Sequence, residues 1–512
     1  AGAEGLIRGF RALPSSGRRG GCGRLSMHTM WGALRPLALA SSLALCCCGL
    51  DDAAAEGACP STGGPGCKEP VAAAAAPAKR RHPWPNKGGN LNVSGFTESI
   101  GPSDVQAASW VWSIDVVNVH TSPVIDDEGN VYYSDTNGGI ISLRKDGTFR
   151  WFHHAPGHNA GSPALHGDLI FCFTDIGLAF ALELATGKTR WEQEVGMSGP
   201  RDSAAMVVAG DVVIMPVNLE GYSTDGNCDF VALGLEDGKK KWSYSVCNVS
   251  GQPSVNAQPA VVDGLVIVHD RTGGMHAFSA EDGRKRWYVE GVSNSTRSNG
   301  GSAVGPNNLA YCGFNREGDN NRGLGMVRAH DISTGKVAWS RTFDRGVNAG
   351  VAVGRLGPKG PLAVIALVSD DFRPPLKWWQ RALFAYSTEW AVWGLQNGGD
   401  VFKGTVAAMD AQTGEDLWTF DVRDKHDWAW HNLASGCVVA AFGAPSIGGD
   451  GTVYVNWSKG SAYAIRDANG DGRIDAGEVT QLHHHGGTNG QTAIAQGLVV
   501  APSCNALVGW TA

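Results

Sequence analysis

One short turn recurs along the chain, and it constrains the fold more than any other feature of the sequence. Each copy places Gly four residues before a Trp and Ala six residues before that Gly. Gly supplies the positive φ that a tight turn needs, and Trp is a large apolar group that can pack on a neighbouring sheet. The pattern is therefore typical of a repeated β-hairpin. Clear copies are Ala181–Trp191, Ala232–Trp242, Ala277–Trp287, Ala329–Trp339 and Ala408–Trp418, with a looser copy ending at Trp151 and another, with a different turn, beyond Tyr463.

These repeated hairpins predict an all-β, eight-bladed β-propeller. The 71 Gly and 18 Trp residues and the 18% of charged residues fit many short strands joined by Gly turns rather than long helices. The last repeat has only three strands, so we expect an N-terminal strand, Trp110–Ile114, to complete that blade and close the ring. Seven blades are the alternative. The expected blades are 123–151, 163–191, 205–242, 259–287, 302–339, about 351–418, a seventh from 445, and an eighth with strands near 492–495, 498–501 and 506–510.

The first 82 residues have the composition of a targeting segment followed by a linker. From Arg35, a basic flank precedes a short apolar run and small residues at 53–55, as in a secretory signal peptide; an incidental apolar stretch is the alternative. Residues 49–82 are rich in Ala, Gly and Pro, which is typical of a linker. We therefore expect the propeller to span 83–512 and the protein to be secreted or otherwise extracytoplasmic, with no transmembrane segment in the mature chain.

Charge and cysteine spacing bear on partners and compartment. Residues 82–512 carry 32 Lys and Arg against 44 Asp and Glu, which disfavours nucleic acid as a partner. Cys228 and Cys247 are symmetric about the turn 236–239, so we predict a disulfide across one hairpin, with Cys59–Cys67 in the linker as a candidate second pair. The remaining cysteines of the propeller fit small buried apolar residues: Cys172, Cys312, Cys437 and Cys504. Triplets that permit glycosylation in a eukaryotic host begin at Asn92, Asn248, Asn294 and Asn456.

The segment 467–478 fits the twelve-residue EF-hand calcium loop at every ligand position. It follows an expected strand at 462–465 and precedes another at 479–482, so it replaces the Gly turn of blade seven. Gly472 allows the sharp bend, and Ile474 faces inward. Because no helices flank the loop, we expect a structural calcium site rather than a calcium switch. The expected ligands are Asp467, Asn469, Asp471, the carbonyl of Arg473, Asp475 and Glu478.

The Ala-x5-Gly-x3-Trp turn resembles the tryptophan-docking repeat of pyrroloquinoline quinone (PQQ) propellers. The segment Trp84–Asn90, followed by Trp110-Val111-Trp112, resembles the start of the same propellers. The resemblance covers residues 83–512 and implies the propeller fold. The family contains quinoprotein alcohol dehydrogenases and also non-enzymatic members, such as the lipoprotein of the bacterial outer-membrane assembly machine, so it does not fix an activity.

The catalytic positions of the quinoprotein dehydrogenases are only partly matched. In the Gly-Asp-Asn segment of that family the Asn ligates the metal beside the cofactor, and here that position is Val401. The last Asp of its His-Asp-x-Trp-Asp segment is the catalytic base, and here that position is Ala429, which can neither take a proton nor bind a cation. The family's adjacent cysteine pair is also missing. These departures argue against PQQ-dependent oxidation, for which Asp427 is the remaining candidate base, and PQQ is a possible but doubted cofactor.

Several polar residues that occur in one blade only lie on the expected connections between blades, which share one face of a propeller. They could line a polar mouth for an anionic or metal-bound ligand. A solvated loop face is the alternative, and we favour it. These residues, which include the candidates for cofactor binding, are Arg201, Arg297, His426, Asp427, His431 and His483–His485.

Blade six contains an insertion, residues 370–403, with helical periodicity. Pro374-Pro375 could open a helix, and apolar and aromatic residues then recur at intervals of three and four as far as Trp393. The insertion could cover the funnel as a lid, present a ridge to a partner, or pack on its own propeller. A polysaccharide- or peptide-binding role would depend on Trp379 and Trp390.

Together these features predict an exported, calcium-binding propeller that is non-catalytic and binds an unknown protein or small molecule at its funnel face. A divergent PQQ-dependent alcohol or sugar dehydrogenase is one alternative, and a polysaccharide- or peptide-binding module is another.

Overall fold

The chain divides into two units, residues 1–74 and 75–512, and the described structure lies in the second. The computed structural model describes residues 80–113, 121–135, 137–159, 161–198, 204–221, 226–250, 255–292, 300–317, 323–369, 379, 401–425, 442–457, 461–483, 490–503 and 506–512. The predicted leader and Cys59–Cys67 lie outside these ranges.

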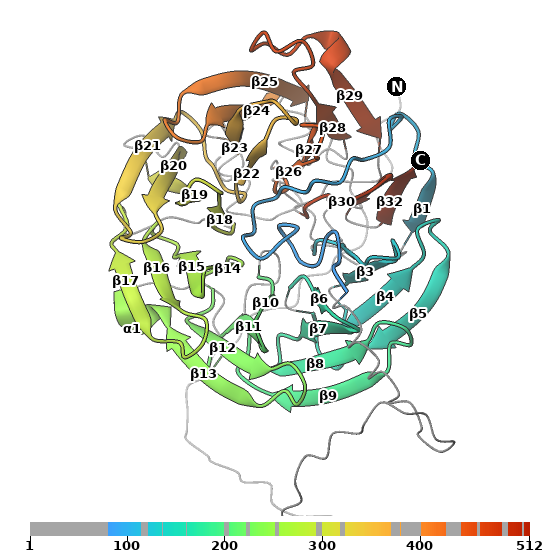
Figure 1. Cartoon of the computed structure of the whole chain (residues 1–512), viewed down its shortest axis with the longest axis vertical. Helices are drawn as coiled ribbons and strands as arrows, with labels where there is room; N and C mark the ends of the chain where they lie inside the picture. Colours follow the sequence, from blue (N-terminus) through green and yellow to red (C-terminus); the bar gives the residue numbers. More distant parts are fainter. Residues whose placement is uncertain are drawn as a thin grey trace, which may run out of the picture. The chain divides into compact units, whose positions relative to one another are not determined.

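Eight four-stranded antiparallel sheets form the blades of a β-propeller, and Figure 1 shows them arranged around one centre. Blade one contains β2 (Val124–Ile125), β3 (Val131–Ser134), β4 (Gly139–Leu143) and β5 (Phe149–His154). Blade two contains β6 (Ala164–His166), β7 (Leu169–Phe173), β8 (Leu178–Glu183) and β9 (Thr189–Glu194). Blade three contains β10 (Val207–Ala209), β11 (Val212–Val217), β12 (Asp229–Gly234) and β13 (Lys240–Ser245).

Blade four contains β14 (Ala260–Val262), β15 (Leu265–His269), β16 (Met275–Ser279) and β17 (Lys285–Val289). Blade five contains β18 (Ala303–Val304), β19 (Leu309–Glu317), β20 (Gly323–Asp331) and β21 (Val337–Phe343). Blade six contains β22 (Ala352–Arg355), β23 (Leu362–Ser369), β24 (Val401–Asp410) and β25 (Asp416–Lys425). Blade seven contains β26 (Ser446–Ile447), β27 (Val453–Trp457), β28 (Ser461–Ile465) and β29 (Val479–His483). The described helices are α1 (Val246–Ser250) and the 3-10 turn η1 (Ala476–Glu478).

Blade eight unites the two ends of the propeller. It contains β30 (Ala493–Ala495), β31 (Leu498–Pro502), β32 (Ala506–Thr511) and, on its outer side, β1 (Trp110–Ser113). The β1–β32 register pairs Trp110 with Gly509 and Trp112 with Leu507. The prediction of eight blades closed by an N-terminal strand is confirmed, and the seven-blade alternative is wrong.

The apolar core lies between neighbouring blades. All six residues of the middle strand β11 are buried, whereas the outer strand β9 buries Trp191 between exposed neighbours. Residues of blade three such as Phe230 and Trp242 pack in one cluster with Phe278 of blade four. Each sheet therefore has two apolar faces, and both are covered by the adjacent blades.

Six tryptophans, in blade eight and blades one to five, each dock their blade onto the next one. Their indole N–H groups donate to backbone carbonyl oxygens at 2.7–3.1 Å. Their rings cover the Gly of the next turn so closely that a Cβ there would lie 2.5–2.7 Å from a ring carbon. The same Gly residues have positive φ, so both the contact and the backbone require glycine. The pairs are Trp110–Gly147, Trp151–Gly187, Trp191–Gly238, Trp242–Gly283, Trp287–Gly335 and Trp339–Gly414.

Residues 84–100, which we name the axial segment, cross the centre of the ring (Figure 1, blue). Backbone carbonyls of this segment accept hydrogen bonds from the inner strand, or from the turn that follows it, in seven blades, at 2.7–2.9 Å. Trp84 at its start is fully buried. The sequence did not predict this role. The donor–acceptor pairs are Ile125–Trp84, Leu165–Pro85, Val261–Leu91, Val304–Asn92, Val353–Ser94, Ile447–Gly95 and Gly497–Ile100.

Candidate functional site

The antiparallel order of each blade divides its loops between two faces. The turns between the third and fourth strands, which receive the docking tryptophans, share one face, and we call it the docking face. The turns between the second and third strands share the opposite face with the connections from one blade to the next, and we call it the connection face. Candidate sites occur on both faces.

The predicted calcium loop lies on the docking face, between β28 and β29 of blade seven. These strands pair directly, with Ile465 opposite Val479, so the loop replaces a short turn as predicted. Gly470 and Gly472 have φ of +75° and +77°, which allows the bends that an EF-hand loop requires. Ile474 packs against the apolar cluster between blades six and seven, while the proposed ligand residues are not buried.

Backbone N–H groups hold the carboxylates of the loop in place. Asp467 accepts hydrogen bonds from Gly470 N at 2.7 Å and Gly472 N at 3.0 Å. Glu478 accepts from Ala468 N at 2.8 Å and Asn469 N at 3.2 Å through Oε1, and from Asp475 N at 3.0 Å through Oε2. These N–H donors lower the pKa of the Glu478 carboxyl, and the N–H of Asp475 has the largest effect. In this conformation the two end residues of the loop are turned toward peptide groups.

The donor set of the loop consists of oxygen atoms in the order that calcium requires. Within the described ranges, however, no three His, Cys, Asp or Glu side chains converge as a ready-made metal cluster. A cation in the loop would compete with these N–H donors for the carboxylate oxygens of Glu478. A loop without a buried scaffold of its own can exchange one set of partners for the other at low cost.

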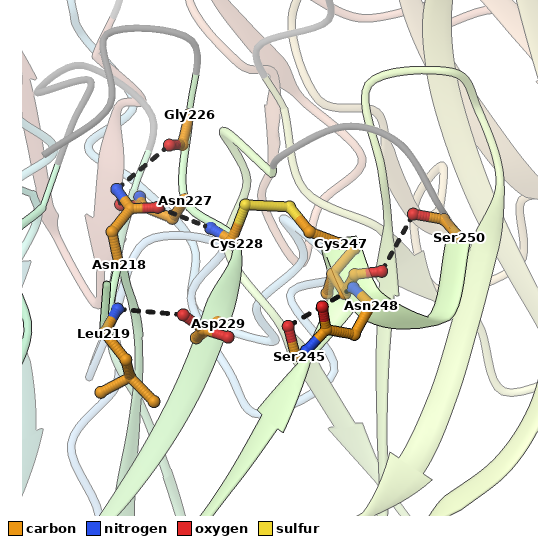
Figure 2. Close-up of a disulfide and its surroundings, with 11 residues drawn as sticks. Asn218, Leu219, Gly226, Asn227, Cys228, Asp229, Ser245, Cys247, Asn248 and Ser250 are labelled. Atoms are coloured by element: carbon orange, nitrogen blue, oxygen red, sulfur yellow. Dashed lines mark hydrogen bonds between the residues drawn. A yellow bond between two sulfur atoms is a disulfide. The ribbon is translucent and has the colours of Figure 1, made fainter. Parts of the chain in front are cut away.

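The connection face carries the predicted disulfide, Cys228–Cys247, with a Cα–Cα distance of 5.1 Å (Figure 2). This prediction is confirmed, although the two cysteines are not directly opposed. The ladder pairs Asp229 with Ser245, so Cys247 lies one residue beyond the position opposite Cys228, in α1. Asn218 fixes the approach to Cys228, because its side chain donates to Gly226 O and accepts from Cys228 N. The bridge thus ties the start of β12 to the connection that leaves blade three.

A buried polar network joins blades three and four. His276 is fully buried; its Nδ1 lies 3.1 Å from Tyr244 Oη and its Nε2 3.2 Å from Asp270 Oδ2. Asp270 also accepts from Thr272 and Gly274 of its own turn. Burial raises the pKa of Tyr244, so its hydroxyl stays protonated and able to donate. No sequence signal marked this network, because His276 occupies the position that Phe180 fills in blade two.

A second histidine of blade four, His269, is also buried, and its Nδ1 lies 3.1 Å from Ser302 Oγ. Burial lowers the pKa of His269 to about 4, and the nearby carboxylate of Asp270 opposes that shift without cancelling it. The imidazole is therefore neutral at physiological pH. His269 thus joins blade four to Ser302 of blade five without placing a positive charge in the core.

Exposed apolar side chains occur in consecutive blades on the connection face. Ile176 and Met197 belong to blade two, Leu219 to blade three and Val292 to blade four, and these residues are 36–53% exposed. Asn218, next to Leu219, bridges to Met197, so the loops of blades two and three touch. This contact brings Met197 close to Leu219, and contiguous exposed apolar surface is typical of a surface that another molecule covers.

Most predicted residues of the polar mouth lie outside the described residues: Arg201, Arg297, His426, Asp427, His431, His484 and His485. The backbone of His483 ends β29. Of the insertion 370–403, the structure describes Trp379 and the first residues of β24. Among the sequons, Asn248 is exposed in α1, Asn92 is half-buried in the axial segment, Asn456 is fully buried, and Asn294 is not among the described residues.

The proteins that are similar to this chain share its repeat family. The family model described as outer membrane protein assembly factor BamB matches residues 103–250 and 221–358, which together span half of the chain. BamB of Burkholderia pseudomallei is 25% identical over 260 residues, which cover 49% of this chain and 63% of that protein. Tetrathionate hydrolase of Acidithiobacillus ferrooxidans is 24% identical over 234 residues, which cover 43% of each protein. The chain thus matches less than two thirds of the length of these relatives.

Solved structures agree on the fold. The crystal structure of BamB from Moraxella catarrhalis superposes with a TM-score of 0.51 at 16% identity, over 79% of this chain and 100% of that one. The quinohemoprotein alcohol dehydrogenase from Comamonas testosteroni gives 0.54 at 12% identity, over 84% of this chain and 80% of that one. At these identities the likeness is one of architecture alone. Among the described residues, no helix has the length and apolar character needed to cross a bilayer.

Proposed function

Because this chain belongs to the BamB family of PQQ-repeat β-propellers, we propose that it is an exported, calcium-binding scaffold that binds a protein partner and catalyses no reaction. This proposal rests on the row of exposed apolar side chains on the connection face. The relatives named as assembly factors make a protein partner the natural occupant of such a face. The disulfide supports export, since such bonds persist in oxidising compartments.

The rival proposal, PQQ-dependent oxidation, lacks support from the chain's own residues. Val401, at the position where the quinoprotein dehydrogenases carry a metal-ligating Asn, begins β24 and pairs with Lys425. A valine side chain has no atom that can ligate a cation. The axial segment also crosses the centre of the ring, where its backbone is hydrogen-bonded to seven blades. A scaffold protein needs neither a metal-ligating side chain at position 401 nor an unobstructed central channel.

Calcium binding is the second part of the proposal. The loop 467–478 offers Asp467, Asn469, Asp471, the carbonyl of Arg473, Asp475 and Glu478. Calcium would cross-link one exposed loop that has no short Gly turn of its own, and so stabilise blade seven.

Photo-crosslinking tests the proposed partner face. With p-benzoylphenylalanine at position 219, we expect a protein adduct in the exported fraction, and Ile176→Ser should weaken that capture about tenfold because one apolar contact is lost. The matched control is position 337, since Val337 is 42% exposed and Leu219 is 40% exposed, but Val337 lies at the docking-turn end of β21. Equal adducts at both positions, or adducts at 337 only, would contradict a partner on the connection face.

A further inference from the structure

Trp418 of blade six breaks the docking rule that the tryptophans of six other blades follow. It is more deeply buried than any of the six docking tryptophans, with 3% of its surface exposed. Within the described residues, however, its indole Nε1 has no hydrogen-bond acceptor. Trp84 and Trp510 also have buried indole N–H groups without an acceptor in the same part of the chain, but neither occupies a docking position. A buried donor left unpaired costs about 1–3 kcal/mol, so this position calls for an explanation.

Strand register identifies the acceptor that Trp418 lacks. In the blade that receives a docking tryptophan, a residue of the third strand pairs with the tryptophan of the fourth strand. The accepting carbonyl lies three positions after that residue. In blade two, for example, Ala181 pairs with Trp191, and Leu184 accepts the N–H of Trp151. In blade seven the equivalent of Ala181 is Ala464, because Ser446, Tyr454 and Ala464 align as Ala164, Phe171 and Ala181 do. Three residues further on is Asp467, the first residue of the acidic loop.

The acidic loop lies against blade six at this point. A Cβ on Gly472 would be 3.0 Å from the carbonyl oxygen of Leu417. Ile474 and Val479 pack on the apolar cluster that contains Trp418. The loop therefore occupies the place of a docking turn, next to an unpaired indole N–H.

Glu478 controls the peptide group that should accept this hydrogen bond. The carbonyl of Asp467 and the N–H of Ala468 belong to one peptide plane. Glu478 Oε1 holds that N–H at 2.8 Å, which fixes the direction of the carbonyl. When both oxygens of Glu478 ligate a cation, this hold on the peptide is released.

We propose that calcium in the loop 467–478 turns the Asp467–Ala468 peptide so that the Asp467 carbonyl accepts the indole N–H of Trp418. The metal then fastens blade seven to blade six through the contact that the Gly turn makes elsewhere in the ring. This inference rests on the calcium binding proposed above. It assigns to Trp418 a positioning role that is coupled to the metal. It also explains why the acidic loop occupies the position of a docking turn.

Calorimetric titration of the full chain with calcium tests the coupling. Trp418→Phe keeps an aromatic ring but removes the donor, so the calcium Kd should weaken about fivefold, the equivalent of one net hydrogen bond made only in the bound state. In a chelator this substitution should lower the melting temperature less than Trp339→Phe does, because both substitutions remove packed ring atoms but only Trp339→Phe also breaks a hydrogen bond. The matched control is Trp339→Phe, whose N–H already bonds Ala411 O at 3.1 Å, so it should lower stability equally with and without calcium and leave Kd unchanged.

The outcomes separate the two proposals. A wild-type chain that gives no binding heat, or that binds calcium as well after Glu478→Gln, would overturn the calcium site itself. Glu415→Gln, in the ordinary turn of blade six, is the control for that substitution. Calcium binding with the same Kd in wild type and Trp418→Phe would overturn the coupling alone. If Trp418→Phe fails to fold, wild-type protein labelled with 15N-tryptophan decides, because one indole N–H resonance should move when calcium is added and a spectrum without change contradicts the proposal.

Discussion

Gly509→Ala should loosen the ring at its closing seam and lower the free energy of unfolding by about 3 kcal/mol. Gly509 lies in β32 opposite Trp110 of β1, and any Cβ there would overlap the indole ring of Trp110. Trp110 cannot move aside freely, since its N–H bonds Lys145 O at 2.9 Å and its ring covers Gly147 of blade one. The overlap therefore falls on the strand that joins the two ends of the propeller.

Hydrogen exchange and thermal unfolding measure this effect. Amides of 109–113 and 506–511 should exchange faster in the Gly509→Ala protein, together with a lower melting temperature. Gly477→Ala is the matched control, because its φ is ordinary and no described atom would lie within 4 Å of the added methyl group. Unchanged exchange across the β1–β32 ladder would show that this seam does not close the ring.

Trp84→Ala should cost about 3–5 kcal/mol and release the axial segment from the hub. Trp84 is fully buried, and it anchors the first of the hydrogen bonds that connect this segment to the inner strands. Gly89 lies against the same ring, where a Cβ would be 2.7 Å from a ring carbon. Loss of the indole leaves a cavity at the start of the segment, so the hydrogen bonds of the following residues should weaken with it.

Limited proteolysis and chemical denaturation check this result. Cleavage within 84–100 should appear in Trp84→Ala under conditions that leave the wild type intact. Leu91→Ala lies in the same segment, but Leu91 is 45% exposed, so that substitution should change stability by no more than about 0.5 kcal/mol. Equal stability of the two variants would mean that the axial segment is dispensable.

The repeat predicted the ring because its signal is local and is copied. Gly187 and Trp191 lie four residues apart, and the docking contact that Gly187 makes recurs at five further turns. Recognition of one such turn in the sequence therefore predicts the other blades. The disulfide and the place of the acidic loop followed from the same hairpin register.

Features that depend on distant backbone were not accessible from the sequence. The axial segment bonds through carbonyl groups, which any residue carries, so no side-chain pattern marks it. The Tyr244–His276–Asp270 network joins two blades, and a single histidine in an apolar strand gives no hint of its partners. The unpaired N–H of Trp418 required knowing which residue of blade seven faces it.

We infer that the connection face binds the partner and that the docking face has a structural role. Exposed Ile176, Met197 and Leu219 lie on the first, which also carries the disulfide. The docking turns and the loop proposed to bind calcium belong to the second. Under this division the repeat has a structural role only. The chain can therefore keep the repeat of the quinoprotein dehydrogenases although Val401 replaces their metal-ligating Asn.

Calorimetric titration of the purified chain with PQQ in the presence of calcium decides between a scaffold and an oxidoreductase. We predict no binding heat from PQQ and no dye reduction with alcohols or sugars, in a sample whose calcium binding is established in the same instrument. Saturable PQQ binding accompanied by substrate-dependent dye reduction would contradict a non-catalytic scaffold and identify the protein as an oxidoreductase.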